Sequence, residues 1–320
     1  MRAFVTGGAG FIGRALVRRL RSRGDDVVAA VRDPSRAGAL LEAGCSVVRS
    51  DLSEVEPLAA QMRGADIVFH LAGMYRVGIL PAERAAMYGA NVRATQVMLD
   101  AVVAAGVGRI LYVSTINAFG NTRGRVVDES YLRREPFAYV SYYDETKHLG
   151  HLAAERRMAA GAPITIVQPG GVYGPDDPSQ IGGALRQAAA GKLRVVVFPD
   201  LGMNMVHVDD LADGIIRAAE RGRAGETYVL GGELVRMRDM VATAAEIGGH
   251  RPPRLTVPDR LLRAVAAISR PFTRLIGQDL GELVSASAGV TYWASDAKAR
   301  RELGYAPREL RDGLRATFAR

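Results

Sequence analysis

The chain has 320 residues, of which 48% are hydrophobic and 24% charged, a composition ordinary for a globular protein with a large core. The net charge of +8 comes from arginines spread along most of the sequence, and aromatic residues make up only 6%. This pattern offers no platform for stacking bases, so it argues against a nucleic-acid-binding protein. The single cysteine, Cys45, excludes an internal disulfide and a cysteine-rich metal cluster.

The chain starts directly in a predicted strand, without a leader segment, and contains no apolar run of 18 residues. We therefore expect a cytoplasmic protein without an integral membrane segment. Length allows one or two domains.

Short apolar runs alternate with amphipathic segments over the first half of the chain, which predicts an α/β fold with a doubly wound parallel Rossmann sheet. Strands are expected at 2–6, 26–32, 45–49, 66–71, 109–114 and 163–168. Helices are expected at 11–22, 35–43, 55–63, 82–105 and 139–160.

After Pro169 the pattern becomes mixed, which predicts a smaller, interleaved C-terminal substrate lobe. We expect the dinucleotide-binding domain to span 1–170 and about 205–231, and the substrate lobe to span about 171–204 and 232–320. Residues 206–221 read as a strand end and a helix, and 226–230 as a strand. Further helices are expected at 234–248, 258–276, 295–303 and 309–318.

Gly7, Gly10 and Gly13 stand three residues apart, where the first predicted strand turns into the first predicted helix. Glycine permits a sharp turn and close approach of a pyrophosphate, and the helix start presents free N–H groups to the anion. The pattern predicts a dinucleotide-binding turn, with an ordinary glycine turn as the alternative.

Tyr143 and Lys147 lie four residues apart in a predicted helix, so the phenol and the ammonium group share one face. A neighbouring cation favours the phenolate and brings the pKa of the tyrosine closer to neutral pH, which suits proton transfer. Ser114 and Thr115 follow the strand at 109–114, where open α/β sheets bind ligands, although both residue types also cap turns.

Together these motifs resemble the extended short-chain dehydrogenase/reductase family, from Met1 to about Asp213 and in family order. Within it, the pattern is most similar to the dihydroflavonol reductase, 3β-hydroxysteroid dehydrogenase and hopanoid-associated epimerase-like branch. Gly73 and Gln168 stand where the family usually has Ala and Arg. Thr6–Gly13 matches the family segment TGxxGxxG, His70–Gly73 matches HLAA, and Asn91–Thr95 matches NVxGT. Further along the chain, Val113–Gly120 matches VSSxxVYG, Gln168–Pro175 matches RPxxVYGP, and Val206–Ala212 matches VHVDDLA.

The resemblance implies that Tyr143 is the catalytic acid/base, that Lys147 tunes it and holds the nicotinamide ribose, and that Thr115 polarises the substrate oxygen. It implies no metal. Relatives often dimerise through the helices expected at 82–105 and 139–160, so we expect a homodimer, and apolar Val97, Met98, Leu99 and Val102 fit either an interface or the core. Cofactor contacts are implied for Gly7, Gly10, Phe11, Ile12, Gly13, Arg32, Arg36, Asp51, Leu52, Leu71, Ala72, Gly73, Asn91, Tyr143, Lys147, Pro169, Gly170 and Val172.

Arg32 stands where NAD-preferring relatives usually place Asp, and Arg36 lies one turn further on. An arginine there binds the 2′-phosphate of NADP, whereas a carboxylate binds the 2′-hydroxyl of NAD. We expect NADP. NAD stays open, because a shift of one residue would point Asp33 at the ribose.

Met203 stands where sugar-nucleotide epimerases of the family usually carry an arginine for the diphosphate. A thioether cannot pair with phosphate and suits an apolar surface, although ordinary packing explains it equally well. Tyr75, Asn117 and Met203 are the expected substrate contacts. The segment 259–276 is basic and amphipathic, with Pro271 expected to kink or end its helix, and reads as a lid or as a membrane-surface helix.

These features predict an NADP-dependent oxidoreductase that interconverts a carbonyl and a secondary alcohol on a fairly apolar small molecule. The first alternative is an NAD-dependent sugar epimerase or dehydratase with the same site. The second is a dinucleotide-sensing binding protein without chemistry, which the retained Tyr143 and Lys147 argue against.

Overall fold

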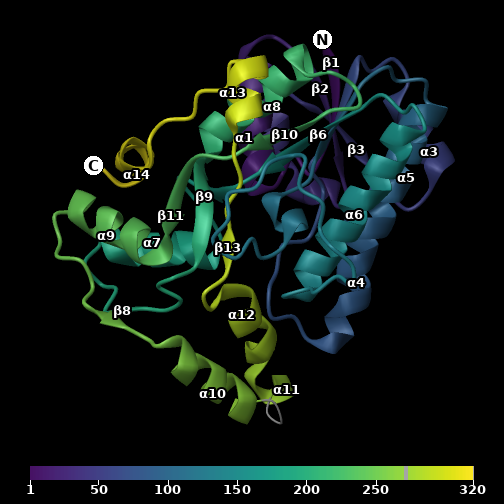
Figure 1. Cartoon of the computed structure of the whole chain (residues 1–320). Helices are drawn as coiled ribbons and strands as arrows, with labels where there is room; N and C mark the ends of the chain where they lie inside the picture. Colours follow the sequence, from purple (N-terminus) through teal and green to yellow (C-terminus); the bar gives the residue numbers. More distant parts are fainter. Residues whose placement is uncertain (270–272, 320) are drawn as a thin grey trace.

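A computed structural model describes residues 1–269 and 273–319, and its centre is a seven-stranded sheet (Figure 1). Every pairing in this sheet is parallel, which confirms the predicted doubly wound α/β fold. The strand order is β10-β6-β5-β4-β1-β2-β3. The strands are β1 (Arg2–Thr6), β2 (Asp26–Val31), β3 (Ser46–Arg49), β4 (Ile67–His70), β5 (Ile110–Val113), β6 (Ile164–Pro169) and β10 (Thr227–Leu230).

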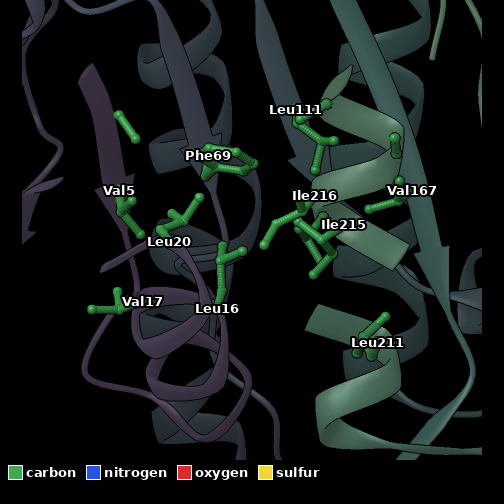
Figure 2. Close-up of a cluster of buried hydrophobic side chains, with 14 of the residues drawn as sticks. Val5, Leu16, Val17, Leu20, Phe69, Leu111, Val167, Leu211, Ile215 and Ile216 are labelled. Atoms are coloured by element: carbon green, nitrogen blue, oxygen red, sulfur yellow. The ribbon is translucent and has the colours of Figure 1, made fainter. Parts of the chain in front are cut away.

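Successive residues of a strand point to opposite faces of the sheet, and both faces are covered. Val5 of β1 belongs to a core with α1 (Phe11–Ser22) and α8 (Val208–Arg221), which pack side by side. Figure 2 shows this core, with Leu16 and Ile215 between the two helices and the sheet. Phe4 faces the other core, under α3 (Val55–Met62), α5 (Ala94–Ala104) and α6 (Tyr142–Ala159).

The helix expected at 82–105 is continuous but not uniform. It starts with the 3-10 turn η2 (Pro81–Glu83) and α4 (Arg84–Tyr88), and a π-helical turn, η3 (Gly89–Arg93), leads into α5. Single π turns are frequent at functional sites. The helix expected at 35–43 is also divided, into η1 (Pro34–Arg36) and α2 (Gly38–Glu42).

A second lobe surrounds strand β9 (Gly202–His207), which pairs with three short strands. These are β7 (Gly171–Tyr173), β11 (Glu233–Arg236) and β13 (Thr291–Tyr292). A separate two-stranded sheet joins β8 (Val195–Val196) to β12 (Leu255–Thr256). The helices of the lobe are α7 (Gln180–Ala189), α9 (Met237–Ile247), α10 (Asp259–Ser269), α11 (Thr273–Ile276), α12 (Leu280–Ser287) and α14 (Leu310–Phe318).

Several elements of this lobe differ from the sequence prediction. Residues 234–236 pair with β9 as strand β11, so the helix expected at 234–248 begins only at Met237. Helix α7, helix α12 and the short strands were not predicted. The segment expected as one helix at 258–276 contains α10 and α11, and the effect predicted for Pro271 lies outside the described residues.

The two lobes also exchange segments across the predicted boundaries. All of β9 pairs within the second sheet, although residues 205–207 were assigned to the first domain. Helix α13 (Ala297–Leu303) was assigned to the substrate lobe, but it packs on α8 and β10. Its Leu303 and the following Tyr305 are buried in the core with Val5. Tertiary contact rather than sequence position decides which lobe these segments join.

Within the described residues, no helix is both long and apolar enough to cross a lipid bilayer.

A buried chain of hydrogen bonds locks the carboxyl ends of β1 and β4 to α5. The His70 ring lies with Nδ1 2.8 Å from Thr6 Oγ1 and Nε2 3.2 Å from Thr95 Oγ1. Thr95 donates its hydroxyl proton to Asn91 O, so it accepts from Nε2–H of His70. His70 Nδ1 is therefore the acceptor of the Thr6 hydroxyl, and Thr6 Oγ1 accepts from Ala72 N. This chain needs a neutral imidazole.

The His70 chain predicts a loss of stability in acid. Burial, with the Lys147 charge as a smaller cause, lowers the pKa of His70 from 6.5 to about 3. Between these values the unfolded chain binds more protons than the folded one. The contribution of neutral His70 to the free energy of unfolding is therefore complete above pH 6.5. It falls by up to about 5 kcal/mol as the pH decreases toward 3.

The measurement is the free energy of unfolding by urea at a series of pH values. His70→Gln should reduce its dependence on pH over this window. His250→Gln, at an exposed histidine, is the matched control and should keep the wild-type dependence. An unchanged dependence in His70→Gln would contradict the assignment.

Candidate active site

The glycine turn between β1 and α1 has the geometry of a dinucleotide-binding turn. Gly7 has a φ of +72°, and a Cβ on it would lie 2.7 Å from the backbone N of Ala72. A Cβ on Gly13 would overlap the carbonyl oxygen of Gly7, so these two glycines are required by packing. Gly10 is exposed and has no side chain to accept from the first N–H groups of α1. Those groups are free for an anion, with half-buried Phe11 and Ile12 beside them.

The ends of β2 and β3 gather three arginines. Arg32 and Arg36 are exposed, and Arg49 lies opposite Val31 in the strand register. The Asp33 carboxylate accepts hydrogen bonds from the Ser35 N–H (3.1 Å) and hydroxyl (2.6 Å), which cap η1. These bonds, with smaller effects of Arg36 and Arg49, lower the pKa of Asp33.

Arg49 was not predicted, and the signal that identifies it is the pairing of β3 beside β2. The residues expected on the adenine side follow directly. Asp51 is exposed and accepts hydrogen bonds from the Ser53 hydroxyl and N–H, while Leu52 has a φ of +59° and packs against the sheet core. These contacts hold the loop after β3 in a fixed shape at the same edge as Arg49.

The loop after β4 is held in place by the side-chain amide of Asn91. Leu71 and Ala72 are half-buried and Gly73 is exposed. Asn91 Oδ1 accepts from Met74 N (2.7 Å), and Asn91 Nδ2 donates to Met74 O (2.9 Å) and Thr146 Oγ1 (3.0 Å). Asn91, expected to contact the cofactor, thus ties this loop to α6.

The turn after β6 is the fourth side of the expected cofactor site. Pro169 is buried, and Gly170 and Val172 are half-buried. A Cβ on Gly170 would overlap the backbone of Asn204, so glycine is required where β6 passes β9. This turn connects the large sheet to the second lobe.

Tyr143 and Lys147 are buried on the same face of α6, toward the carboxyl ends of β4 and β5. The Tyr143 ring meets the Tyr75 ring edge-on, with centroids 4.9 Å apart. Lys147 Nζ lies 5.6 Å from the centroid of the Tyr112 ring, which stacks on His70 at 5.5 Å. The two side chains predicted to act together therefore both point into the protein at the edge that carries the glycine turn.

Burial dominates the electrostatics of this pair. It raises the pKa of Tyr143 well above its ordinary value, with Tyr75 as a further cause, while a hydrogen bond with Thr115 works in the opposite direction. Burial also lowers the pKa of Lys147 to about 8. The sequence predicted that Lys147 would lower the pKa of Tyr143, but desolvation shifts it upward.

Thr115 lies two residues after the end of β5 and caps the short helix η4 (Ile116–Phe119). Its Oγ1 accepts from Asn117 N (3.2 Å) and donates to Asn117 Oδ1 (3.1 Å). Gln168, which replaces the usual family arginine, donates Nε2–H to the Thr115 carbonyl at 3.3 Å. Ser114 Oγ lies 3.1 Å from His151 Nδ1, so it is held against α6 and Thr115 is the hydroxyl beside Tyr143.

An ion pair that sequence reasoning missed fixes the first turn of α6. Both terminal nitrogens of Arg133 donate to Asp144, at 2.6 and 2.8 Å, and the side chains are 7% and 0% exposed. Val140 N also donates to Asp144. Removing one partner of such a buried pair costs about 3–5 kcal/mol. Arg133 lies in a loop without periodicity, so the sequence carries no signal for this contact.

The expected substrate contacts lie in different environments. Tyr75 is 61% exposed beside Tyr143, and Asn117 is half-buried next to Thr115. Met203 is 9% exposed in β9 and packs in the core of the second lobe with Tyr173 and Val235. The alternative stated for Met203, ordinary packing, therefore accounts for its position.

Comparison with known proteins identifies the family of this chain. Residues 3–231 match the NAD dependent epimerase/dehydratase family. The chain is 31% identical to a 4-hydroxy-2-methyl-3-oxo-4-farnesyl-3,4-dihydroquinoline-1-oxide ketoreductase of Stigmatella aurantiaca, covering 96% of this chain and 92% of the relative. It is 31% identical to a putative dihydroflavonol 4-reductase of Synechocystis sp., covering 97% and 92%.

A solved structure agrees with the fold. A double mutant of DesIV, a dTDP-glucose 4,6-dehydratase from Streptomyces venezuelae with NAD bound, superposes with a TM-score of 0.77 and 28% identity, covering 99% of this chain and 96% of that one. The predictions of an extended short-chain dehydrogenase/reductase and of an NAD(P)-dependent enzyme are confirmed. The chain belongs to the NAD dependent epimerase/dehydratase family.

Proposed function

We propose that this protein is an NADP-dependent oxidoreductase that interconverts a carbonyl and a secondary alcohol on a fairly apolar small molecule. The observation that carries the proposal is the shared buried face of Tyr143 and Lys147 on α6, beside Thr115. Strands β1, β4 and β5 are neighbours, so the glycine turn opens at the same edge of the sheet. A hydride carrier and a proton donor would therefore meet there.

The chemistry divides between the cofactor and the chain. A bound nicotinamide dinucleotide would supply or accept the hydride. Tyr143 would donate its proton to the carbonyl oxygen in reduction, or accept the hydroxyl proton in oxidation. The Thr115 hydroxyl, which donates to Asn117 Oδ1 without substrate, would turn to donate a hydrogen bond to the same oxygen. Because burial keeps the phenol protonated, the site suits proton donation to a carbonyl.

NADP is favoured by the arginines at the ends of β2 and β3. Arg32, Arg36 and Arg49 offer guanidinium groups that pair well with a 2′-phosphate. The carboxylate that would favour NAD, on Asp33, is already bound to the Ser35 N–H and hydroxyl.

An apolar carbonyl substrate is supported by the residues around Tyr143. Met74 and Val77 are half-buried and pack with Tyr143 and buried Ile79. The two relatives described above are named a ketoreductase and a putative dihydroflavonol 4-reductase. A sugar epimerase or dehydratase is the second candidate, because the chain also resembles a dTDP-glucose 4,6-dehydratase. Copurified NAD without net cofactor turnover would favour that candidate.

The catalytic assignment predicts that Tyr143→Phe lowers kcat about 10²–10⁴-fold, because positioned proton transfer contributes by that amount. Binding of NADPH, followed by fluorescence titration, should change little. Turnover is measured on a panel of ketones and alcohols that includes steroids and flavonoids. Tyr142→Phe, at the half-buried neighbouring position, is the control and should retain activity. Full turnover in Tyr143→Phe would refute the mechanism.

The cofactor assignment predicts that Arg32→Ala combined with Arg49→Ala weakens NADPH binding about 10- to 100-fold. This is the range expected for the loss of hydrogen bonds to a charged group. The dissociation constant for NADH should change much less, because NADH lacks the 2′-phosphate. Arg63→Ala, at an exposed arginine after α3, is the matched control. Equal losses for both cofactors would argue against 2′-phosphate recognition.

A homodimer and a cytoplasmic location stay predictions. Of the residues that fitted an interface, Met98, Leu99 and Val102 are buried within the protomer and Val97 is half-buried, so the core accounts for them. Sedimentation at micromolar concentration tests the dimer directly. A mass of twice 34.3 kDa would support it, and a monomer alone would reject it.

A further inference from the structure

Helix α10 presents one apolar face to the protein and a second one to solvent. Leu262 and Ala266 face inward and pack against α12. Leu261, Val265 and Ile268 follow the helical spacing i, i+4, i+7 and are 55%, 48% and 73% exposed. The core uses only one of the two faces.

The exposed apolar surface continues into α11. Leu275 and Ile276 are 87% and 46% exposed. Figure 1 places α10 and α11 together at one extremity of the second lobe, away from the seven-stranded sheet. Exposed apolar side chains gathered in this way mark an interaction surface. We call Leu261, Val265, Ile268, Leu275 and Ile276 the α10–α11 ridge.

The ridge is accompanied by positive charge. Residues 250–269 contain four arginines and one aspartate, a net charge of 4 − 1 = +3. The four arginines (Arg251, Arg254, Arg260 and Arg263) are all exposed. The pairing of Leu255 with Val195 also sets Arg194 beside Arg254.

The chemistry of this surface selects its partner. A second copy of the chain would bring positive charge against positive charge, which is repulsive. Protein interfaces are enriched in aromatic residues, Met and Arg, and of these residues 250–269 contain arginine alone, without Tyr, Trp, Phe or Met. An aliphatic ridge accompanied by arginines matches a surface that is apolar below and negatively charged above, which is an anionic lipid bilayer.

We propose that the α10–α11 ridge docks this protein on the surface of anionic membranes. The aliphatic side chains would enter the boundary between headgroups and acyl chains, and the arginines would contact lipid phosphates. Helix α12, on which α10 packs, is connected to the candidate active site, because Tyr142 N at the start of α6 donates to Glu282 of α12 at 2.9 Å. Entry of an apolar substrate from the bilayer is a consequence that rests on the proposed function, whereas membrane binding does not.

The test is cosedimentation of the full chain with vesicles, without substrate or cofactor. Vesicles of phosphatidylcholine alone are compared with vesicles containing about 30% phosphatidylglycerol. We expect binding to the anionic vesicles, weaker binding to the neutral ones, and release at about 0.5 M NaCl, where charges are screened.

Variants separate the two parts of the surface. Ile268→Asp should weaken binding at least about tenfold, since it removes an aliphatic side chain from the inserted face. Arg254→Gln and Arg260→Gln should each weaken binding to anionic vesicles about fivefold. Val103→Asp, at a side chain 57% exposed on α5, and Arg315→Gln, at an exposed arginine of α14, are the matched controls. Circular dichroism checks folding, and Val265→Ser replaces Ile268→Asp should that variant unfold.

The outcomes are distinct. The proposal is overturned if the wild-type protein does not bind anionic vesicles, or if the folded ridge variant (Ile268→Asp, or Val265→Ser in its place) binds them as well as the wild type. If the protein binds polyglutamate but not vesicles, and if this binding is weakened by the arginine variants but not by the ridge variant, the proposal is overturned in favour of an acidic protein partner. Self-association that depends on the ridge would overturn it in favour of a second copy. The vesicle assay contains neither cofactor nor substrate. A failure of the proposed oxidoreductase function would therefore not affect a positive result for membrane binding.

Discussion

The site depends on the burial of polar side chains along the first half of α6. Tyr143, Asp144 and Lys147 are all buried there, and each needs compensation that water cannot supply. Asp144 receives both terminal nitrogens of Arg133, and Lys147 faces the Tyr112 ring. The helix can then hold a phenol and an ammonium group at the sheet edge without solvent. The same desolvation raises the pKa of Tyr143, which keeps the phenol protonated, and lowers the pKa of Lys147, which disfavours its charged form.

The edge that α6 faces is itself held by polar contacts rather than by packing alone. His70 joins Thr6 to Thr95, and Asn91 joins the loop after β4 to Thr146. These bonds connect the glycine turn, the end of β4 and α6 in one network. Residues that family motifs assign to cofactor binding therefore also fix the geometry in which a cofactor would be bound.

The two ends of the molecule contrast in how they use charge and apolar surface. Around α6, Asp144 is paired with Arg133 and Lys147 is buried against the Tyr112 ring, which gives fixed geometry. Around α10 the arginines and aliphatic side chains are exposed, on a helix that packs through its other face. An exposed apolar surface next to positive charge gains free energy only by contact with a partner, so we assign this end to docking.

The sequence by itself determined the parallel sheet, the glycine turn and the helix that carries Tyr143 and Lys147. Each of these depends on local periodicity, or on residues a few positions apart. Only the tertiary structure decided the partners that lie far apart in the chain, namely Arg49 beside Val31 at the end of β2, Arg133 on Asp144, and α13 against α8. The direction of the pKa shift of Tyr143 was also decided only by the tertiary structure. Spacing along a helix reveals a neighbouring cation, but desolvation depends on everything that surrounds the side chain.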